Sequence, residues 1–101
     1  MLTIKVFDII QSPYAVSREQ GELMYVQVMN AHNKTTGVII IDFEGITNTL
    51  YAFLNCMYGQ FILSYGGCEI IHRIEFVNCT PIIITKLNSV KTNAINNYID
   101  N

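Results

Sequence analysis

The fold of this chain is decided by the segment Val38-Ile39-Ile40-Ile41-Asp42-Phe43-Glu44-Gly45-Ile46. Its first four residues are all β-branched and place apolar side chains on both faces of a strand. This pattern is typical of a central parallel strand that is covered by helices on one side and packed on the other. The more polar run from Asp42 to Asn48 predicts the loop that leads out of the strand.

Upstream of this segment, the N-terminal residues predict a first strand. Apolar and polar side chains alternate from Leu2 onward, in a β-favouring stretch that continues to Ile10. The sequence Gln11-Ser12-Pro13 favours a turn, so we expect the strand to end there.

A helix is predicted over residues 17–30. Ser17 and Gln20 have the spacing of a capping box, in which each side chain hydrogen-bonds the backbone of the other residue. Gly21 lowers the helix propensity by about 1 kcal/mol. The uninterrupted run is nevertheless too long for a typical strand, and the polar cluster 32–37 ends it as a loop between a helix and a strand would.

A second helix is expected after the central strand, capped by Asn48 or Thr49 and continuing to about Ser64. One stripe at helical spacing is predicted to pack on the sheet: Leu50, Phe53, Leu54, Met57 and Phe61. A second stripe is amphipathic rather than charged: Tyr51, Asn55, Tyr58 and Ile62. This second stripe either packs under the C-terminal helix or forms an exposed contact patch.

The last part of the chain predicts a third strand and a third helix. Tyr65-Gly66-Gly67 breaks the second helix, residues 69–73 suit a short turn, and Ile74 to Val77 reads as a strand. Thr80 is expected to cap the third helix, with Pro81 at its first position. Its core side is predicted to carry Ile83, Leu87, Val90, Ala94 and Tyr98, and its water side Lys86, Asn93 and Asn97.

Together these elements predict one α/β domain over residues 1–101. Their order is strand-helix-strand-helix-strand-helix, which right-handed crossovers turn into a mostly parallel sheet with helices on one face.

The composition argues against several classes of function. Only 14% of the 101 residues are charged, the net charge is -2 and no basic cluster occurs, so a nucleic-acid partner is not expected. The N-terminus has no basic region followed by a long apolar run, and the least polar window, Leu50 to Leu63, is too short to span a bilayer. A cytoplasmic protein without membrane contact is expected.

Neither a metal site nor a cofactor is expected. Cys56, Cys68 and Cys79 include no CxxC pair, which disfavours a structural zinc site and favours free thiols in a reducing compartment. Cys56 falls in the middle of the second helix and is expected to serve packing.

Two acidic residues suggest a catalytic or ligand-binding function as one alternative. Asp42 and Glu44 follow the central strand at the end where α/β folds carry their sites, so they could serve a small hydrolase or bind a metal or another ligand. The competing interpretation is a solvated loop in which Asp42 accepts backbone hydrogen bonds and Gly45 permits the turn. His32 and His72 are remote from each other and from any nucleophile in the chain.

Several short motifs resemble those of one known family. They are Ser17-Arg18, the segment Asp42 to Ile46 after the strand, Phe53, Tyr58-Gly59 and Val77-Asn78. With this pattern, the region from Ser12 to Tyr98 resembles the STAS-like domain family of unknown function, which is similar to the anti-sigma-factor antagonists of bacteria.

The resemblance implies a domain that docks onto a protein partner. In such antagonists the loop after the central strand and the first turn of the next helix bind a histidine-kinase-like ATPase, which phosphorylates a serine there. The matching position here is Tyr51, and neither Leu50 nor Ala52 supplies a hydroxyl. A non-catalytic, regulatory interaction module without the serine switch is therefore expected. Its expected contact residues are Tyr14, Arg18, Thr47, Asn48, Thr49, Tyr51, Asn55 and Tyr58.

Self-association is a further alternative, because a homodimer could bury the same tyrosine and amide side chains. The many Asn and Ile residues indicate an AT-rich genome, bacterial or phage.

Overall fold

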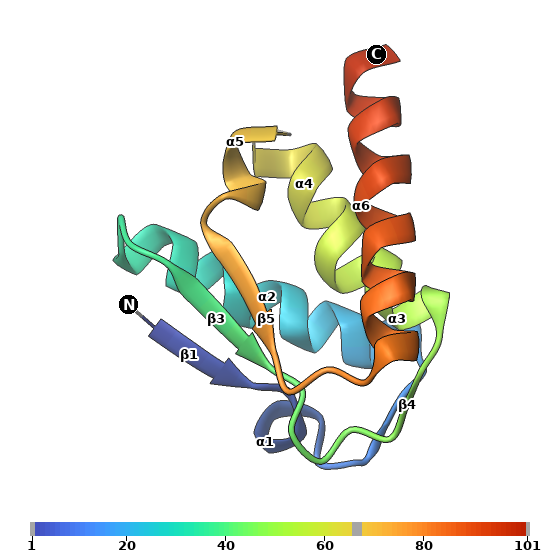
Figure 1. Cartoon of the computed structure of the whole chain (residues 1–101). Coiled ribbons are helices and arrows are strands. Elements are labelled where there is room, and N and C mark those ends of the chain that lie inside the picture. The colour runs from blue at the N-terminus through green and yellow to red at the C-terminus, as the bar shows by residue number, and fades with distance from the viewer. Residues whose placement is uncertain (1, 66–67, 101) are drawn as a thin grey trace.

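The computed structural model describes residues 2–65 and 68–100, and its centre is a three-stranded parallel sheet (Figure 1). The strands are β1 (Leu2–Lys5), β3 (Ile39–Asp42) and β5 (Ile74–Val77), in the order β1-β3-β5. Leu2 lies opposite Ile39, which lies opposite Ile74. The predicted α/β fold with a mostly parallel sheet is confirmed, and the isoleucine strand occupies its centre.

The first strand is shorter than predicted. It ends at Lys5, and α1 (Val6–Ile10) replaces its expected second half. The helical turn places the side chain of Val6 in the core, fully buried, and it closes at Gln11, whose φ of 58° lies in the left-handed region.

The helix α2 (Arg18–Lys34) begins as predicted and ends later. Both hydrogen bonds of the Ser17–Gln20 capping box are present, so the predicted start is confirmed. The expected loop after Asn30 is wrong, because the helix adds another turn that includes His32. Its end is marked by the N–H of Thr35, which donates to the carbonyl of Ala31 at 3.1 Å.

The second long helix has three parts: α3 (Tyr51–Leu54), the π-helical η1 (Asn55–Gly59) and α4 (Gln60–Tyr65). The predicted cap at Asn48 or Thr49 is wrong. Both residues form β4 (Asn48–Thr49), which pairs in parallel with β2 (Tyr14–Ala15). Their backbone therefore stays extended, and Leu50 becomes the N-cap without a side-chain hydrogen bond.

The chain continues through α5 (Cys68–Ile71) to β5 and then α6 (Pro81–Asp100). Gly66 and Gly67, on which the predicted helix break falls, lie outside the described residues. The Thr80 hydroxyl accepts from the N–H of Ile83 at 3.3 Å, so the predicted cap of α6 is confirmed.

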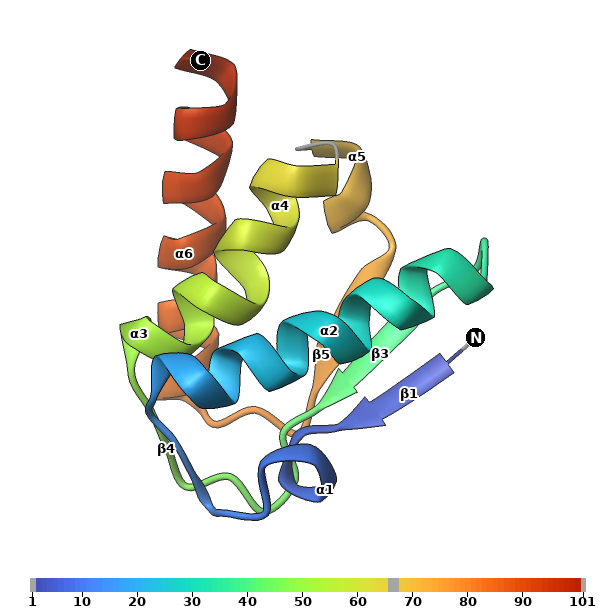
Figure 2. The same cartoon turned by 180° about the vertical axis from the view of Figure 1, so that it is seen from behind.

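The helices lie on one side of the sheet, as Figures 1 and 2 show from opposite directions: α2 and α4 cover it, and α6 packs against α4. In the part of the chain described here, no helix covers the other face, which carries Thr3, Ile40 and Glu75. The expectation that the central strand is packed on both sides is therefore wrong. No helix of the described part has the length and apolarity needed to cross a membrane.

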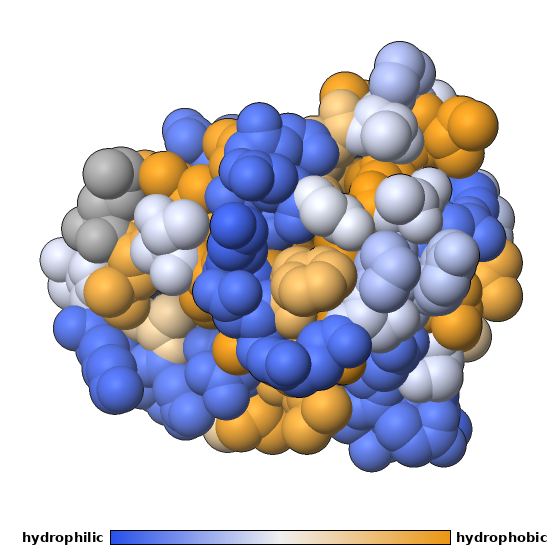
Figure 3. All heavy atoms as spheres, turned by 90° about the horizontal axis from the view of Figure 1, so that it is seen from below, coloured by the Kyte–Doolittle hydropathy of each residue, from blue (hydrophilic) through white to orange (hydrophobic). Residues whose placement is uncertain are grey.

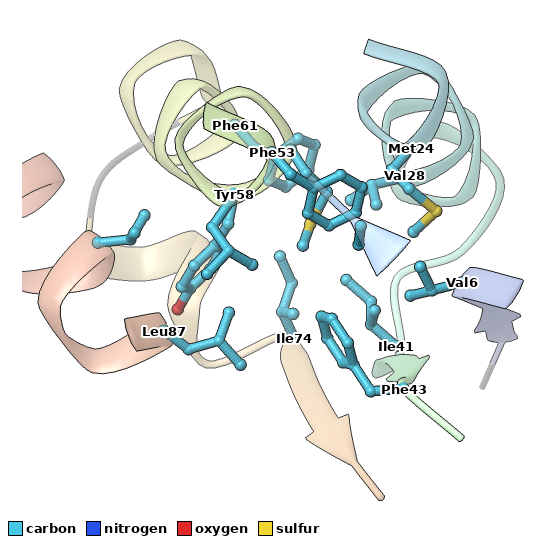
Figure 4. Packing of buried hydrophobic residues seen from close by; sticks show 14 of the residues in the cluster. Val6, Met24, Val28, Ile41, Phe43, Phe53, Tyr58, Phe61, Ile74 and Leu87 are labelled. Carbon is cyan, nitrogen blue, oxygen red and sulfur yellow. The ribbon is translucent and has the colours of Figure 1, made fainter. Parts of the chain in front are cut away.

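Side chains from the sheet, α2, the second long helix and α6 meet in one core, which Figure 4 shows from close by. The predicted sheet-facing stripe is buried at Phe53, Leu54, Met57 and Phe61. Leu50, expected there too, is 47% exposed because it caps the helix instead of lying on its inner face. The core side of α6 is confirmed for Ile83, Leu87, Val90 and Ala94. The side chain of Tyr98 lies outside the described residues.

Candidate functional site

One end of the domain gathers the N-terminal ends of α2, α3 and α6 around the short β2–β4 pair (Figures 1 and 2). Backbone hydrogen bonds tie the loops together there. The N–H of Thr47 donates to the carbonyl of Pro13 at 2.8 Å, and the N–H of Leu50 donates to the carbonyl of Ala15 at 3.1 Å. The loop after the central strand is thus held against the segment that precedes α2.

Gln20 fixes that segment further. Its side-chain oxygen accepts from the N–H groups of Val16 at 2.8 Å and Ser17 at 3.0 Å, while its nitrogen donates to the carbonyl of Tyr14 at 3.0 Å. One amide side chain therefore satisfies three backbone groups. The ring of Tyr14 projects from this braced backbone and is 56% exposed.

Lys86 joins α6 to the start of α3. Its Nζ donates to the carbonyl of Thr49 at 2.6 Å and lies 5.7 Å from the centroid of the Tyr51 ring. The prediction that Lys86 simply faces water is wrong, because the long side chain reaches back along the helix surface to a backbone oxygen. Tyr51 is held beside α6 while remaining 45% exposed.

The structure divides the eight expected contact residues into two groups. Six are exposed: Tyr14, Arg18, Thr47, Asn48, Tyr51 and Asn55. Thr49 and Tyr58 are only 1% and 3% exposed. Tyr58 packs edge-on against Phe76, with ring centroids 4.8 Å apart, and burial raises its pKa to about 12. These two residues support the surface from inside the fold, so we remove both from the proposed contacts.

The amphipathic stripe of the second helix is split in the same way. Tyr58 and Ile62 are buried, whereas Tyr51 and Asn55 face outward. The stripe passes through the π-helical turn η1, and its exposed part ends within that turn.

Two apolar residues at this end were not expected from the sequence. Leu50 is 47% exposed and Ile82 is 68% exposed. Ile82 lies one turn before Lys86 on α6 and therefore on the side of the helix that faces Tyr51. The sequence did contain a signal for the exposure of Ile82, because this residue does not fit the helical spacing of the core positions that begin at Ile83.

We call this region the docking surface. Its apolar part consists of Tyr14, Leu50, Tyr51 and Ile82, and its polar rim of Arg18, Thr47, Asn48 and Asn55. Figure 3 views the molecule from this end, where apolar residues lie among polar ones. Protein interfaces likewise combine apolar and polar side chains.

Asp42 serves the loop that carries part of this surface. Its Oδ1 accepts from the N–H of Glu44 at 2.8 Å and from Nδ2 of Asn78 at 2.9 Å. The hydrogen bond from Asn78 lowers the pKa of Asp42, and the N–H of Glu44 and the charge of Lys5 act in the same direction against the effect of burial. Gly45 takes a φ of 86° in the same turn. This arrangement favours a structural carboxylate.

The surroundings of Glu44 give little support to a hydrolase or metal-binding site. Glu44 is exposed, and its Oε1 lies 3.9 Å from Nζ of Lys5. Among the side chains that the structure describes, no group of three or more His, Cys, Asp or Glu could hold a metal ion. Cys56 and Cys79 are free and half-buried, and burial raises the pKa of each thiol.

His32 lies in a cluster far from the docking surface. The guanidinium of Arg73 donates to Nδ1 of His32 at 2.5 Å and also to the carbonyls of Thr35 and Gly37. The imidazole packs edge-on against Phe61 and Tyr65. Because the guanidinium can only donate, Nδ1 must accept and the ring must be neutral. Burial, and then the charge of Arg73, lower the pKa of His32.

We expect this cluster to make stability depend on pH. In the unfolded chain His32 has a pKa of about 6.5, so between the lower folded value and 6.5 the unfolded state binds more protons. The free energy of unfolding should therefore be at its full value above this window and fall as the pH drops through it. Urea unfolding at pH 8, 7, 6 and 5 measures the slope. His32→Asn, which keeps an acceptor but does not titrate, should flatten it.

The matched control is His72→Asn, since His72 is exposed. This variant should retain the slope of the unmodified protein. An unchanged slope in His32→Asn would show that the cluster does not cause the pH dependence.

Residues 20–83 match the protein family described as the STAS-like domain of unknown function. No curated protein and no solved structure shows a significant match. The matched region includes the parallel strands β3 and β5, the loop after β3 and the whole of α3 to α4. The chain therefore belongs to the STAS-like domain family, as its sequence motifs predicted.

Proposed function

We propose that this chain is a non-catalytic interaction module of the cytoplasm that binds a protein partner through the docking surface. The observation that carries the proposal is the exposure of Tyr14, Leu50, Tyr51 and Ile82 at one end of the domain. Large aromatic and aliphatic side chains held on a rigid support lose little conformational freedom on binding, and such residues form the energetic centre of many interfaces.

The support beneath these residues is rigid for identifiable reasons. Gln20 braces the backbone of Tyr14, and Lys86 joins the carbonyl before Leu50 to α6. The β2–β4 pair holds the two loops in register. A partner would therefore meet a preformed surface.

The position that carries a phosphorylatable serine in related antagonists is Tyr51. A serine kinase has no substrate there, so we propose binding that is not switched off by serine phosphorylation. The proposed partner class is a histidine-kinase-like ATPase, which is the partner that the family resemblance implies.

The test replaces the exposed part of the helix start. A Tyr51→Asp, Asn55→Arg double variant puts a carboxylate and a guanidinium where the surface is aromatic and neutral. We expect it to weaken binding of the partner captured from the native host at least tenfold, because a charge desolvated in an interface without a partner is costly. Affinity capture with mass spectrometry identifies the partner, and calorimetry with the purified pair measures the change.

The control is Leu23→Asp, which charges an exposed leucine on the outward side of α2. It should recover the same partner as the unmodified chain. If the double variant remains folded and binds with unchanged affinity, the docking surface is wrong. Light scattering over a range of concentrations tests whether a second copy of the chain covers this surface instead.

A further inference from the structure

A groove with a volume of about 470 Å³ adjoins the docking surface, between α2 and the α3–η1 part of the second long helix. The two helices meet at Gly21, where an added Cβ would lie 2.7 Å from Cβ of Cys56. On the solvent side of this contact the groove is lined by Arg18, Glu22, Tyr25, Asn55, Cys56 and Gln60. Arg18 and Asn55 belong to both the groove and the docking surface, so the two are continuous.

The charges around the groove favour a cation. Burial is the main cause of the raised pKa of the Cys56 thiol in the groove lining; of the charges nearby, Glu22 and Glu19 raise it further and Arg18 lowers it. Arg18 is itself paired with Glu22 along the helix, at 3.3 Å between Nε and Oε1, and both side chains are exposed. An exposed pair of this kind is weak, so an incoming cation can take over the carboxylate while Arg18 moves into solvent.

The neutral residues of the groove favour one particular cation. Asn55 and Gln60 bring amide groups to the groove from the second long helix, and Tyr25 brings from α2 an aromatic ring that also packs edge-on against Phe61. A guanidinium has five donors in a planar fork and stacks on aromatic faces, whereas an ammonium is a compact, strongly hydrated point charge. The groove therefore matches arginine better than lysine.

We propose that the groove between α2 and η1 receives an arginine side chain of the partner protein, which places its guanidinium between Glu22 and the amides of Asn55 and Gln60. This inference rests on the proposed function, because it describes one contact of the same interface. The aliphatic stem of the arginine would lie over the small side chains of Ala52 and Cys56.

The direct test is a titration with N-acetyl-arginine-N-methylamide, followed by the backbone amide resonances of the ¹⁵N-labelled chain. We expect saturable shifts at Glu22, Asn55, Cys56 and Gln60. The citrulline analogue, which has the same shape without the charge, should bind at least threefold more weakly, and the glutamate analogue should cause no saturable shift at these residues. Equal shifts with the arginine and citrulline probes, or no saturation with arginine, would overturn the proposal.

Two variants locate the effect in the groove. Glu22→Gln removes the carboxylate and should weaken the arginine probe at least threefold, whereas Asp8→Asn removes an exposed carboxylate elsewhere and should not. Ala52→Leu fills the groove from an exposed position and should abolish the shifts. If the probe binds Glu22→Gln as tightly as the unmodified chain, the assigned site is wrong.

Binding measurements with the captured partner distinguish failure of the groove proposal from failure of the proposed function. Glu22→Gln and Ala52→Leu should each weaken partner binding at least threefold. If both variants bind the partner normally while the Tyr51→Asp, Asn55→Arg variant does not, the groove proposal fails and the docking surface stands. If all three bind normally, both proposals fail.

Discussion

Replacing Gly21 with alanine is expected to lower the free energy of unfolding by about 2 kcal/mol, although alanine is the better helix former by about 1 kcal/mol. The new Cβ would lie 2.7 Å from Cβ of Cys56 and 2.8 Å from the carbonyl oxygen of Phe53. One of these atoms belongs to the backbone, so rotating a side chain does not relieve the contact. The axes of α2 and α3–η1 must separate, and the packing of both helices on the sheet suffers.

The control for Gly21 lies in the same helix. At Asn30, which is exposed, alanine should be more stabilising than glycine by about 1 kcal/mol, the ordinary difference in helix propensity. Urea unfolding of the four proteins, with glycine and alanine at each position, measures both differences. If alanine stabilises the chain at position 21 as it does at position 30, the two helices do not approach as closely as described. Gly21→Val should lose more stability than Gly21→Ala.

Replacing Arg73 with methionine is expected to cost about 2–4 kcal/mol, because hydrogen bonds that involve a charged group contribute about 1.5–3 kcal/mol each and part of this is recovered by water. The guanidinium joins His32 near the end of α2 to the carbonyls of Thr35 and Gly37 and to the start of β5. Its loss leaves two carbonyls and the imidazole without their donor. The melting temperature should fall by roughly 8–32 °C, given about 4–8 °C per kcal/mol for a domain of this size.

Two further variants test this explanation. Arg73→Lys keeps the charge but cannot reach three acceptors at once, so it should restore less than half of the lost stability. Arg18→Met removes an exposed arginine that forms a surface pair with Glu22, and it should change the free energy of unfolding by less than about 0.5 kcal/mol. A small effect of Arg73→Met would mean that water replaces the guanidinium without loss.

Much of the fold could be predicted because the deciding signals are local. Residues 38–41 carry only β-branched side chains, and the Ser17–Gln20 capping box depends on backbone groups three residues apart. The caps and the core side of α6 follow from the same short-range rules. One boundary error has a clear long-range cause. Leu50 rather than Thr49 caps the second helix because β4 pairs with β2, a contact between residues more than thirty positions apart.

The candidate surface was predicted in part. Tyr14, Arg18, Tyr51 and Asn55 were expected to be contacts, and all four are exposed. Helical spacing placed Tyr58 on the same stripe as Tyr51, but spacing does not say where a stripe leaves the core. Ile82 was missed because it lies outside the core period of α6, and the sequence does not say which neighbouring element that side of the helix lies beside.

The sequence by itself determined the parallel α/β architecture, the family and the capped starts of α2 and α6, because periodicity and capping act over a few residues. The tertiary structure alone decided which side chains remain in solvent, how Lys86 and Arg73 are used, and why position 21 requires glycine. These features depend on where two helices cross and on which groups that crossing brings together. The distance between two crossing helices cannot be read from residues that are neighbours in the sequence.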